Sequence, residues 1–291
     1  MKNYYLLLFA FYFLLPVFSQ SVESDSTGLL WEITGKKVKS PSYLFGTIHL
    51  ISADKFYFPD ALEPIITDSE LIVMEIGELS EQMEAVQFLM LEEGDLFDHF
   101  SAEQEDSLLI FVDNQLNIAK DQSKLMFGRM KPMALMQLFA QAYFDEQPKS
   151  YEMKINELAQ KHNVKVEGLE TVEEQIALFD AIPMDEQVEM LMESVRDFEK
   201  QKEQFKEMET AYLSQDLKKL QDVLHSDSNH LIMQHESNIL INRNKNWIPK
   251  IKRLMKKNKT FIAVGAGHLQ GEDGLIQLLK DEGYELKPIR L

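Results

Sequence analysis

Two apolar segments at opposite ends of the chain share one pattern, and this pair constrains the fold more than any other feature. Residues 42–50 read SYLFGTIHL and residues 260–269 read TFIAVGAGHL, so each apolar run ends in Gly-x-x-His-Leu. Each run has the composition of a buried strand. If both strands lie in one sheet, His49 and His268 converge beyond its carboxyl edge, where ligands bind in open α/β sheets.

The glycines of the repeated motif, Gly46 and Gly265, are expected to border the same place. Glycine at the end of a strand lets another backbone or a ligand approach closely, because no Cβ intervenes. A single Gly-x-x-His is a weak signal, and two copies that each close an apolar run are more specific. The alternative for each histidine is a buried side chain with satisfied hydrogen bonds.

The distribution of strand and helix patterns predicts the fold class. Strand-like segments cluster at both ends of the chain, whereas helical periodicity fills the middle, from about residue 80 to 143 and from 171 to 258, with breaks near 183 and 226–228. We therefore expect an α/β domain with a central mixed sheet, pseudo-duplicated strand–Gly-x-x-His units and a large helical insertion.

Two carboxylates end predicted strands in the same way. Glu75 closes LIVME and Glu170 closes VKVEGLE. A charged side chain at the end of a buried strand is costly unless it is paired or ligating. Two imidazoles with one or two carboxylates match the ligands of Zn, Mn, Fe or Co, and without metal they match a general acid and base. The alternative is that both carboxylates cap neighbouring loops.

The remaining polar candidates carry weaker signals. Arg243 and Asn244 form a polar pair beside an apolar helix stripe, and a solvated helix face is the default interpretation of such a pair. The sequence has no His-Glu-x-x-His motif, so a zincin-type protease is not expected. The other histidines are expected at the surface or turned away from one another: His99, His162, His225, His230 and His235.

The amino-terminal segment predicts export. One lysine precedes an apolar run over residues 4–15, and small polar residues follow Pro16, which is the pattern of a secretory signal peptide. We expect residues 1–20 to be removed and residues 21–291 to form one domain in the periplasm or outside the cell. An uncleaved anchor is the alternative, but the run is short for a membrane span. No stable membrane insertion is expected after cleavage.

The charge and the cysteine content of the chain limit the classes of molecule that it is expected to bind. Acidic residues number 48 against 30 basic ones, for a formal charge of −18, so nucleic acid and anionic lipid are not expected to bind. The chain has no cysteine, which excludes a disulfide framework and a lipoprotein anchor. A peptide or small-molecule substrate is the partner that we expect.

Together these motifs resemble the TraB/GumN family, which includes the Tiki metalloproteases and is distantly similar to erythromycin esterases and ChaN haem-iron proteins. The resemblance rests on the paired Gly-x-x-His motifs, the strand-end glutamate, GLET followed by EEQIALFDAIP, the Arg-Asn pair and VGAGHLQGEDG. It implies that His49, Glu75 and His268 carry the chemistry, supported by further residues: Glu170, Arg243 and Asn244. Glu152 stands where the family commonly has Asp, so any role there stays open.

The residues and the resemblance favour a secreted metal-dependent hydrolase that acts on peptide bonds. Its divalent ion, Mn, Co or Zn, would be held by His49, His268 and Glu75, or Glu75 would act as base on a metal-activated water. Arg243 would orient a carboxylate or polarise the scissile carbonyl. Glu170 is expected to hold a histidine through its other ring nitrogen.

Two other function classes stay open. One is a binding protein without catalysis, for haem, iron or a peptide, in which the Met-rich segment 131–143 would line the ligand pocket. The other is a metal-free, esterase-like hydrolase that uses His49 and Glu75 as its acid and base.

Overall fold

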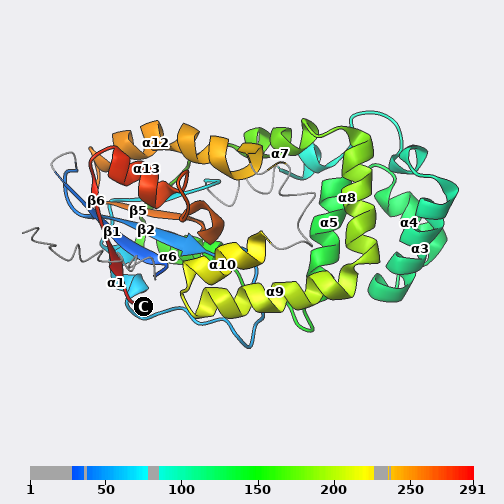
Figure 1. Ribbon diagram of the computed structural model, residues 1–291, viewed down its shortest axis with the longest axis horizontal. Coiled ribbons are helices and arrows are strands. Elements are labelled where there is room, and N and C mark those ends of the chain that lie inside the picture. Colours follow the sequence, from blue (N-terminus) through cyan, green and yellow to red (C-terminus); the bar gives the residue numbers. More distant parts are fainter. Residues whose placement is uncertain (1–27, 36–37, 78–84, 226–234, 236) are drawn as a thin grey trace, which may run out of the picture.

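The computed structural model describes residues 28–35, 38–77, 85–225, 235 and 237–291 (Figure 1). The predicted signal segment at 1–20, the predicted helix break at 226–228 and His230 lie outside the described residues. In the view of Figure 1, a sheet with its covering helices occupies one end of the molecule and a group of helices occupies the other.

Six strands form one mixed sheet in the order β4–β3–β5–β2–β1–β6. The strands are β1 (Leu30–Thr34), β2 (Ser42–Thr47), β3 (Leu71–Met74), β4 (Lys165–Gly168), β5 (Thr260–Gly265) and β6 (Glu285–Ile289). The first four in this order are parallel, while β1 runs antiparallel to β2 and β6. The predicted α/β fold with a central mixed sheet is confirmed.

The two strands of the repeated motif lie side by side. β2 and β5 pair in parallel, with Gly46 opposite Val264 and Thr47 opposite Gly265. Their side chains are almost all buried, as expected for a parallel sheet covered on both faces. His49 and His268 therefore follow the same edge of the sheet, as the sequence predicted.

Gly46 provides the close approach that its place in the strand suggested. A methyl group built on it would lie 2.6 Å from Cδ1 of Leu269 and 3.1 Å from Cα of Ala266, in the short helix η6 (Ala266–His268). The backbone of η6 thus packs directly against β2, and this contact ties the two copies of the motif together.

The Gly46→Ala variant is expected to lose about 1–3 kcal/mol of unfolding free energy, because the new methyl group must push the η6 backbone away. Urea unfolding measures this loss. Gly267→Ala is the matched control in the second motif, since its methyl group would meet only the end of the flexible Leu224 side chain, at 3.3 Å. Equal stability of Gly46→Ala and the parent chain would contradict the close packing.

Helices cover both faces of the sheet, with α12 and α13 on one side and α1 and α6 on the other (Figure 1). Their bounds are α1 (Leu62–Thr67), α6 (Tyr151–His162), α12 (Asn242–Met255) and α13 (Leu275–Asp281). Each contributes buried apolar side chains to the main hydrophobic core around the sheet. The stripe of α12, with Trp247, Ile248 and Ile251, is typical of a helix that packs on a sheet.

A second hydrophobic core lies in the helical insertion, which runs through η1 (Ala85–Leu89), η2 (Leu96–His99), α3 (Ala102–Leu116), α4 (Lys120–Phe127), α5 (Pro132–Ala140), η3 (Gln141–Tyr143), α7 (Val172–Asp180) and α8 (Met184–Arg196). The Met-rich segment belongs mainly to α5, whose Leu135 and Phe139 are fully buried in this core. That packing favours the structural interpretation of the methionines over a ligand-binding wall.

Helix α9 (Phe198–Leu213) reaches both cores: Phe198 packs in the insertion, and Tyr212 packs in the sheet core. The Tyr212 hydroxyl donates a hydrogen bond of 3.0 Å to the carbonyl of Gly46. The described residues between α9 and α12 include α10 (Leu217–Leu224) and the π-helical turn η5 (Ser237–Ile241).

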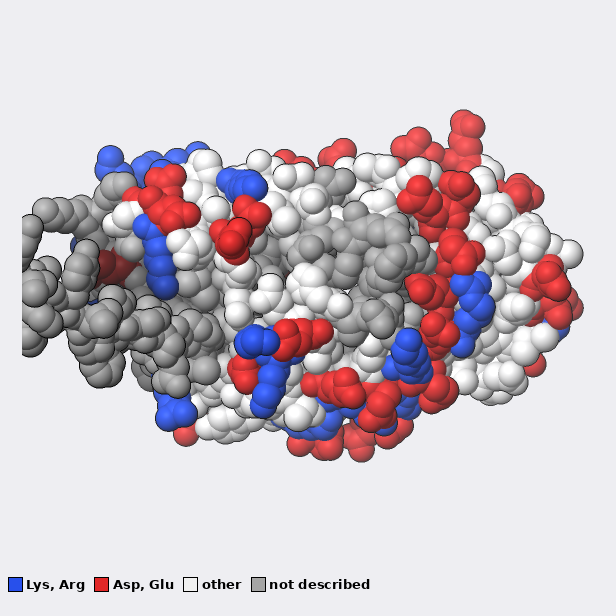
Figure 2. Space-filling view, in the orientation of Figure 1, with Lys and Arg blue, Asp and Glu red and all other residues white. Residues whose placement is uncertain are grey.

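Acidic side chains gather over α8 and α9 with lysine and arginine side chains among them (Figure 2). Their ion pairs, such as Arg196 with Glu189 and Lys206 with Glu203, are about half exposed, which is the solvated helix face expected from the sequence. Among the described residues, no helix combines the length and the hydropathy that crossing a membrane requires.

Candidate functional site

Three predicted site residues meet in front of Gly265. A methyl group built on this glycine would lie 3.2 Å from Oε1 of Glu75, 3.5 Å from Nε2 of His49 and 3.7 Å from Cδ2 of His268. These residues follow β3, β2 and β5, which are neighbouring parallel strands, so their carboxyl ends deliver the three side chains to one point. A side chain at residue 265 would fill that point.

Glu75 is buried, with 7% of its surface exposed, and both of its oxygens are hydrogen-bonded. Oε1 accepts a hydrogen bond of 2.7 Å from the backbone N–H of Gly265, and Oε2 accepts one of 2.5 Å from Nη2 of Arg243. The side-chain amide of Gln175, on α7, adds a longer hydrogen bond to Oε2, at 3.3 Å. The carboxylate is therefore held rigidly, with Oε1 facing the shared point.

Arg243 is the buried cation of the site, and all five of its N–H groups have acceptors. Nη2 donates to Glu75 and Glu170, and Nε donates to Glu170 at 3.0 Å. Nη1 donates to the carbonyl of Ile239 at 3.0 Å and contacts Nε2 of His268 at 3.3 Å. Because guanidinium has five donors and no acceptor, none remains for a substrate carbonyl. The arrangement favours the orienting role over the polarising one.

Glu170 lies beside Glu75 because β3 and β4 stay paired beyond their ends: its N–H donates to the carbonyl of Glu75 at 3.0 Å. Its carboxylate binds Arg243 and accepts a hydrogen bond of 3.2 Å from the indole of Trp247. The sequence predicts that this carboxylate holds a histidine. The structure differs, because Arg243 fills the space between this carboxylate and His268.

The GLET motif has a second, local function. Thr171 caps α7, since its hydroxyl accepts from the N–H of Glu174 while the Glu174 carboxylate accepts from the N–H of Thr171. This capping box starts α7 directly after Glu170. The first turn of α7 then brings Gln175 to both site carboxylates.

His268 is held by Asn244, the residue that follows Arg243 on α12. Nδ1 of His268 lies 2.7 Å from Oδ1 of Asn244, whose amide nitrogen donates to the carbonyls of His268 and Asp273. Oδ1 can only accept, so Nδ1 carries the proton. Nε2 then accepts from Arg243, and the two partners together fix the ring.

His49 is the exposed histidine of the site, with 67% of its side chain accessible. Its Nδ1 lies 2.9 Å from Oε1 of Glu152, which also accepts a hydrogen bond of 2.6 Å from the hydroxyl of Thr47. Ser150 donates to the second oxygen of Glu152, at 2.8 Å. Glu152, whose role the sequence left open, thus orients His49 and leaves Nε2 facing the shared point.

The charges of the three groups follow from these surroundings. Burial opposes the ionisation of Glu75, but the positive charges of His268, His49 and Arg243 and the Gly265 amide outweigh it and lower the pKa of Glu75 to about 2. Burial lowers the pKa of His268 to about 4, although Glu75 favours its protonated form. His268 is therefore charged only in acid, where it helps to lower the pKa of Glu75, and it is neutral at pH 7. At pH 7, Arg243 and His49 supply the charge that keeps Glu75 ionised.

The pKa of His49 moves in the opposite direction. Desolvation of the ring disfavours its protonated form. The charge and hydrogen bond of the Glu152 carboxylate, together with the charge of Glu75, outweigh this and raise the pKa of His49 to about 9. Water screens part of this attraction because the ring is largely exposed. At neutral pH the site therefore combines an ionised Glu75 with a protonated His49.

Glu152→Gln is expected to lower the pKa of His49 by at least about one unit, toward its ordinary value of 6.5, because the main charge that raises it is removed. An NMR titration of the His49 ring measures this. Glu157→Gln, on the same helix but paired at the surface with Lys154, is the matched control and should change nothing at His49. A pKa that stays near 9 in Glu152→Gln would contradict the role of this carboxylate.

The side chains at the shared point are a poor fit for the divalent ion that the sequence favours. Among the described residues, no group of three or more His, Cys, Asp or Glu side chains is arranged to hold a metal ion. Nε2 of His268 is engaged by Arg243, and a metal ion there would lie next to a permanent positive charge. A site with His49, Glu75 and His268 as ligands would thus require Arg243 to move.

The chain was compared with known proteins. The model of the TraB/PrgY/gumN family matches residues 29–288. The chain belongs to this family. The match confirms the resemblance seen in the sequence, and residues 29–288 contain every residue of the candidate site described above. No curated protein and no solved structure matches the chain.

The remaining histidines with described side chains lie away from the shared point. His162 and His235 contact surface glutamates, and Nδ1 of His225 bonds the carbonyl of Gln221 at the end of α10. The functional residues that sequence reasoning missed are Gln175 and Trp247, whose partners come from distant parts of the chain.

Proposed function

We propose that the chain is a hydrolase that cleaves acyl bonds, peptide bonds first among them, at the point in front of Gly265. The observation that carries this proposal is the meeting of Nε2 of His49 with Oε1 of Glu75 at that point. A carboxylate and an imidazole within reach of one substrate atom can act as a base and an acid. Membership of the family supports the fold, and the activity rests on the site.

In the proposed reaction, Oε1 of Glu75 takes a proton from a water molecule while the oxygen of that water attacks the carbonyl carbon. The protonated Nε2 of His49 gives its proton to the leaving nitrogen or oxygen as the bond to carbon breaks. The proton on Glu75 then passes to His49, which restores both groups. Environments that keep one group ionised and the other protonated support this division of roles.

The supporting residues keep these two groups in place. Arg243 and the Gly265 amide fix Glu75, and Glu152 fixes His49. Asn244 fixes His268, whose Nε2 lies 3.8 Å from Oε1 of Glu75. Fixed positions lower the barrier because the reacting groups need not be ordered during the reaction. Peptide bonds are proposed first because of the resemblance to Tiki proteases.

A divalent ion, Mn, Co or Zn, is the second form of the proposal, and the engagement of His268 by Arg243 makes it the less favoured one. The test measures hydrolysis of a fluorogenic peptide and an aryl ester before and after exhaustive chelation. We expect activity to persist. Activity that disappears and returns with one of these ions would support the metal-dependent form, and failure to cleave either substrate would contradict the hydrolase.

We also propose that residues 1–20 direct export and are then removed, which leaves residues 21–291 in the periplasm or outside the cell. The proposal rests on the charged start, the apolar run and the small polar residues that follow it. Mass spectrometry of the protein from the exported fraction tests it. A full-length chain found only inside the cell would contradict it.

A further inference from the structure

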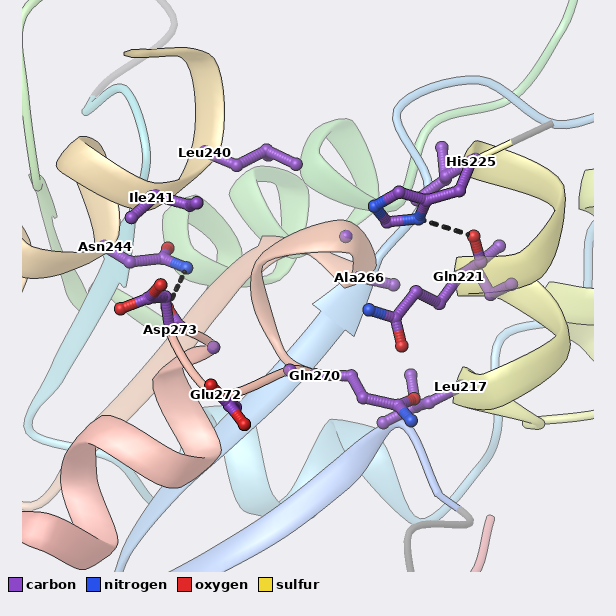
Figure 3. Close-up of a pocket in the computed structure, with 15 residues that line it drawn as sticks. Leu217, Gln221, His225, Leu240, Ile241, Asn244, Ala266, Gln270, Glu272 and Asp273 are labelled. Atoms are coloured by element: carbon purple, nitrogen blue, oxygen red, sulfur yellow. Dashed lines mark hydrogen bonds between the residues drawn. The ribbon is translucent and has the colours of Figure 1, made fainter. Parts of the chain in front are cut away.

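A cavity of about 150 Å³ lies between α10, the start of α12 and the loop 270–274 that follows η6 (Figure 3). Aliphatic side chains form much of its wall: Leu217, Leu220, Leu224, Leu240 and Ile241. Polar side chains from Gln221, His225, Asn244 and Gln270 also line it. The mixture of an apolar wall with a few convergent polar groups is typical of small-molecule sites.

Gln270 supplies an unusual acceptor in this cavity. Its Oε1 is buried and has no hydrogen-bond partner among the described residues. A buried acceptor without a partner raises the free energy of the folded chain, so a ligand that brings an N–H or O–H group gains by bonding to it. Figure 3 shows the side chains of Gln221 and Gln270 in the space between α10 and the loop.

The cavity shares its wall with the proposed catalytic site. Asn244 lines the cavity and also holds Nδ1 of His268. Ala266 and Gly267, which line the cavity too, connect Gly265 to His268 along the chain. Since a methyl group on Gly267 would come within 3.3 Å of Leu224, the absence of a side chain there keeps the cavity open.

Size and charge define the group that fits. The volume of about 150 Å³ is that of a cavity that accepts a molecule of the size of benzene. Glu272 is exposed at the rim, and Asp273 beside it pairs with Lys245 at 2.9 Å, so the rim does not attract an anion. A neutral aliphatic or aromatic group next to a hydrogen-bond donor meets all of these conditions.

We propose that this cavity binds the neutral apolar side chain of an amino-acid residue of the substrate, with the backbone N–H of that residue donating to Oε1 of Gln270. The inference rests on the proposed hydrolase function and narrows it to peptides or amides that carry such a residue.

The first experiment compares N-acetyl-leucinamide with N-acetyl-glycinamide by isothermal titration to the whole chain. The two probes differ only in the isobutyl group, and its burial should give the leucine compound at least about tenfold higher affinity. In assays of hydrolysis, the leucine compound should inhibit competitively. Equal affinity of the two probes, or inhibition that is not competitive, would overturn the proposal.

Two variants locate the binding. Gly267→Val puts a side chain into the cavity. It should weaken the binding of the leucine compound at least about tenfold and change the binding of the glycine compound little. Gln270→Leu removes the buried acceptor that has no partner, so it should raise the unfolding temperature. It should also weaken the binding of the leucine compound about threefold to tenfold, because one hydrogen bond is lost. Gln277→Leu is the matched control, because Gln277 is exposed on α13, and it should leave binding unchanged.

The titration needs no turnover, so its result is separate from that of the hydrolysis test. A leucine preference that Gly267→Val removes supports the cavity as the binding place. The same preference undiminished in Gly267→Val would place the probe elsewhere and overturn the proposal, even in a chain that is an active hydrolase.

Discussion

His49→Gln is expected to lower kcat/KM for hydrolysis at least about a hundredfold, because glutamine keeps the bulk of the side chain but cannot donate a proton to the leaving group. The variant should fold normally, since His49 is largely exposed and fills no core. A stopped or continuous assay with the substrates used for the chelation test measures the loss, and urea unfolding shows that the fold is kept.

His162→Gln is the matched control for this experiment. His162 ends α6, the helix that carries Glu152, and it lies at the surface near Glu63. It should keep the full activity of the parent chain. If His49→Gln were as active as His162→Gln, the acid role of His49 and the mechanism built on it would be wrong.

The largest loss of stability is expected for Arg243→Met. The change leaves Glu75 and Glu170 as neighbouring buried carboxylates without their cation, and removal of one partner from a buried ion pair costs about 3–5 kcal/mol of unfolding free energy. Methionine has a similar length, so little of the loss comes from empty volume. The measurement is urea unfolding followed by circular dichroism.

Two further variants test whether this loss of stability comes from the uncompensated buried charge. Arg196→Met removes a half-exposed pair with Glu189 on α8 and should cost about 0–1 kcal/mol. The triple variant Arg243→Met, Glu75→Gln, Glu170→Gln should recover part of the loss, because the uncompensated buried charges are gone. A single variant at Arg243 that is no less stable than Arg196→Met would contradict the buried network.

The edge of the sheet could be predicted from sequence because its signals are local. The apolar runs before Gly46 and Gly265 define two strands, and the shared motif predicts their alignment, which the parallel pairing confirms. Glu75 stood out because a charge at the end of a buried strand needs a partner. For these positions, the neighbouring residues in the sequence were enough to predict where the side chain lies in the fold.

The partners of these residues could not be predicted, because they come from distant helices. Glu152 reaches Thr47 across 105 residues, and in the sequence it is only an acidic residue in the first turn of a helix, where such residues are common. Gln175 follows the capping box of α7, and Trp247 belongs to an apolar stripe, so both have ordinary local explanations. Only the folded chain brings them to Glu170 and Glu75.

Helix α9 connects the two hydrophobic cores rigidly and fixes the rotation of one relative to the other. Phe198 is anchored in one core and Tyr212 in the other, and a helix turns by about 100° and rises by about 1.5 Å with each residue. One residue inserted between them would therefore rotate the insertion against the sheet by more than a quarter turn. Most of the exposed positions of α9 can vary in identity, but the number of residues from Phe198 to Tyr212 is set by the pitch of the helix.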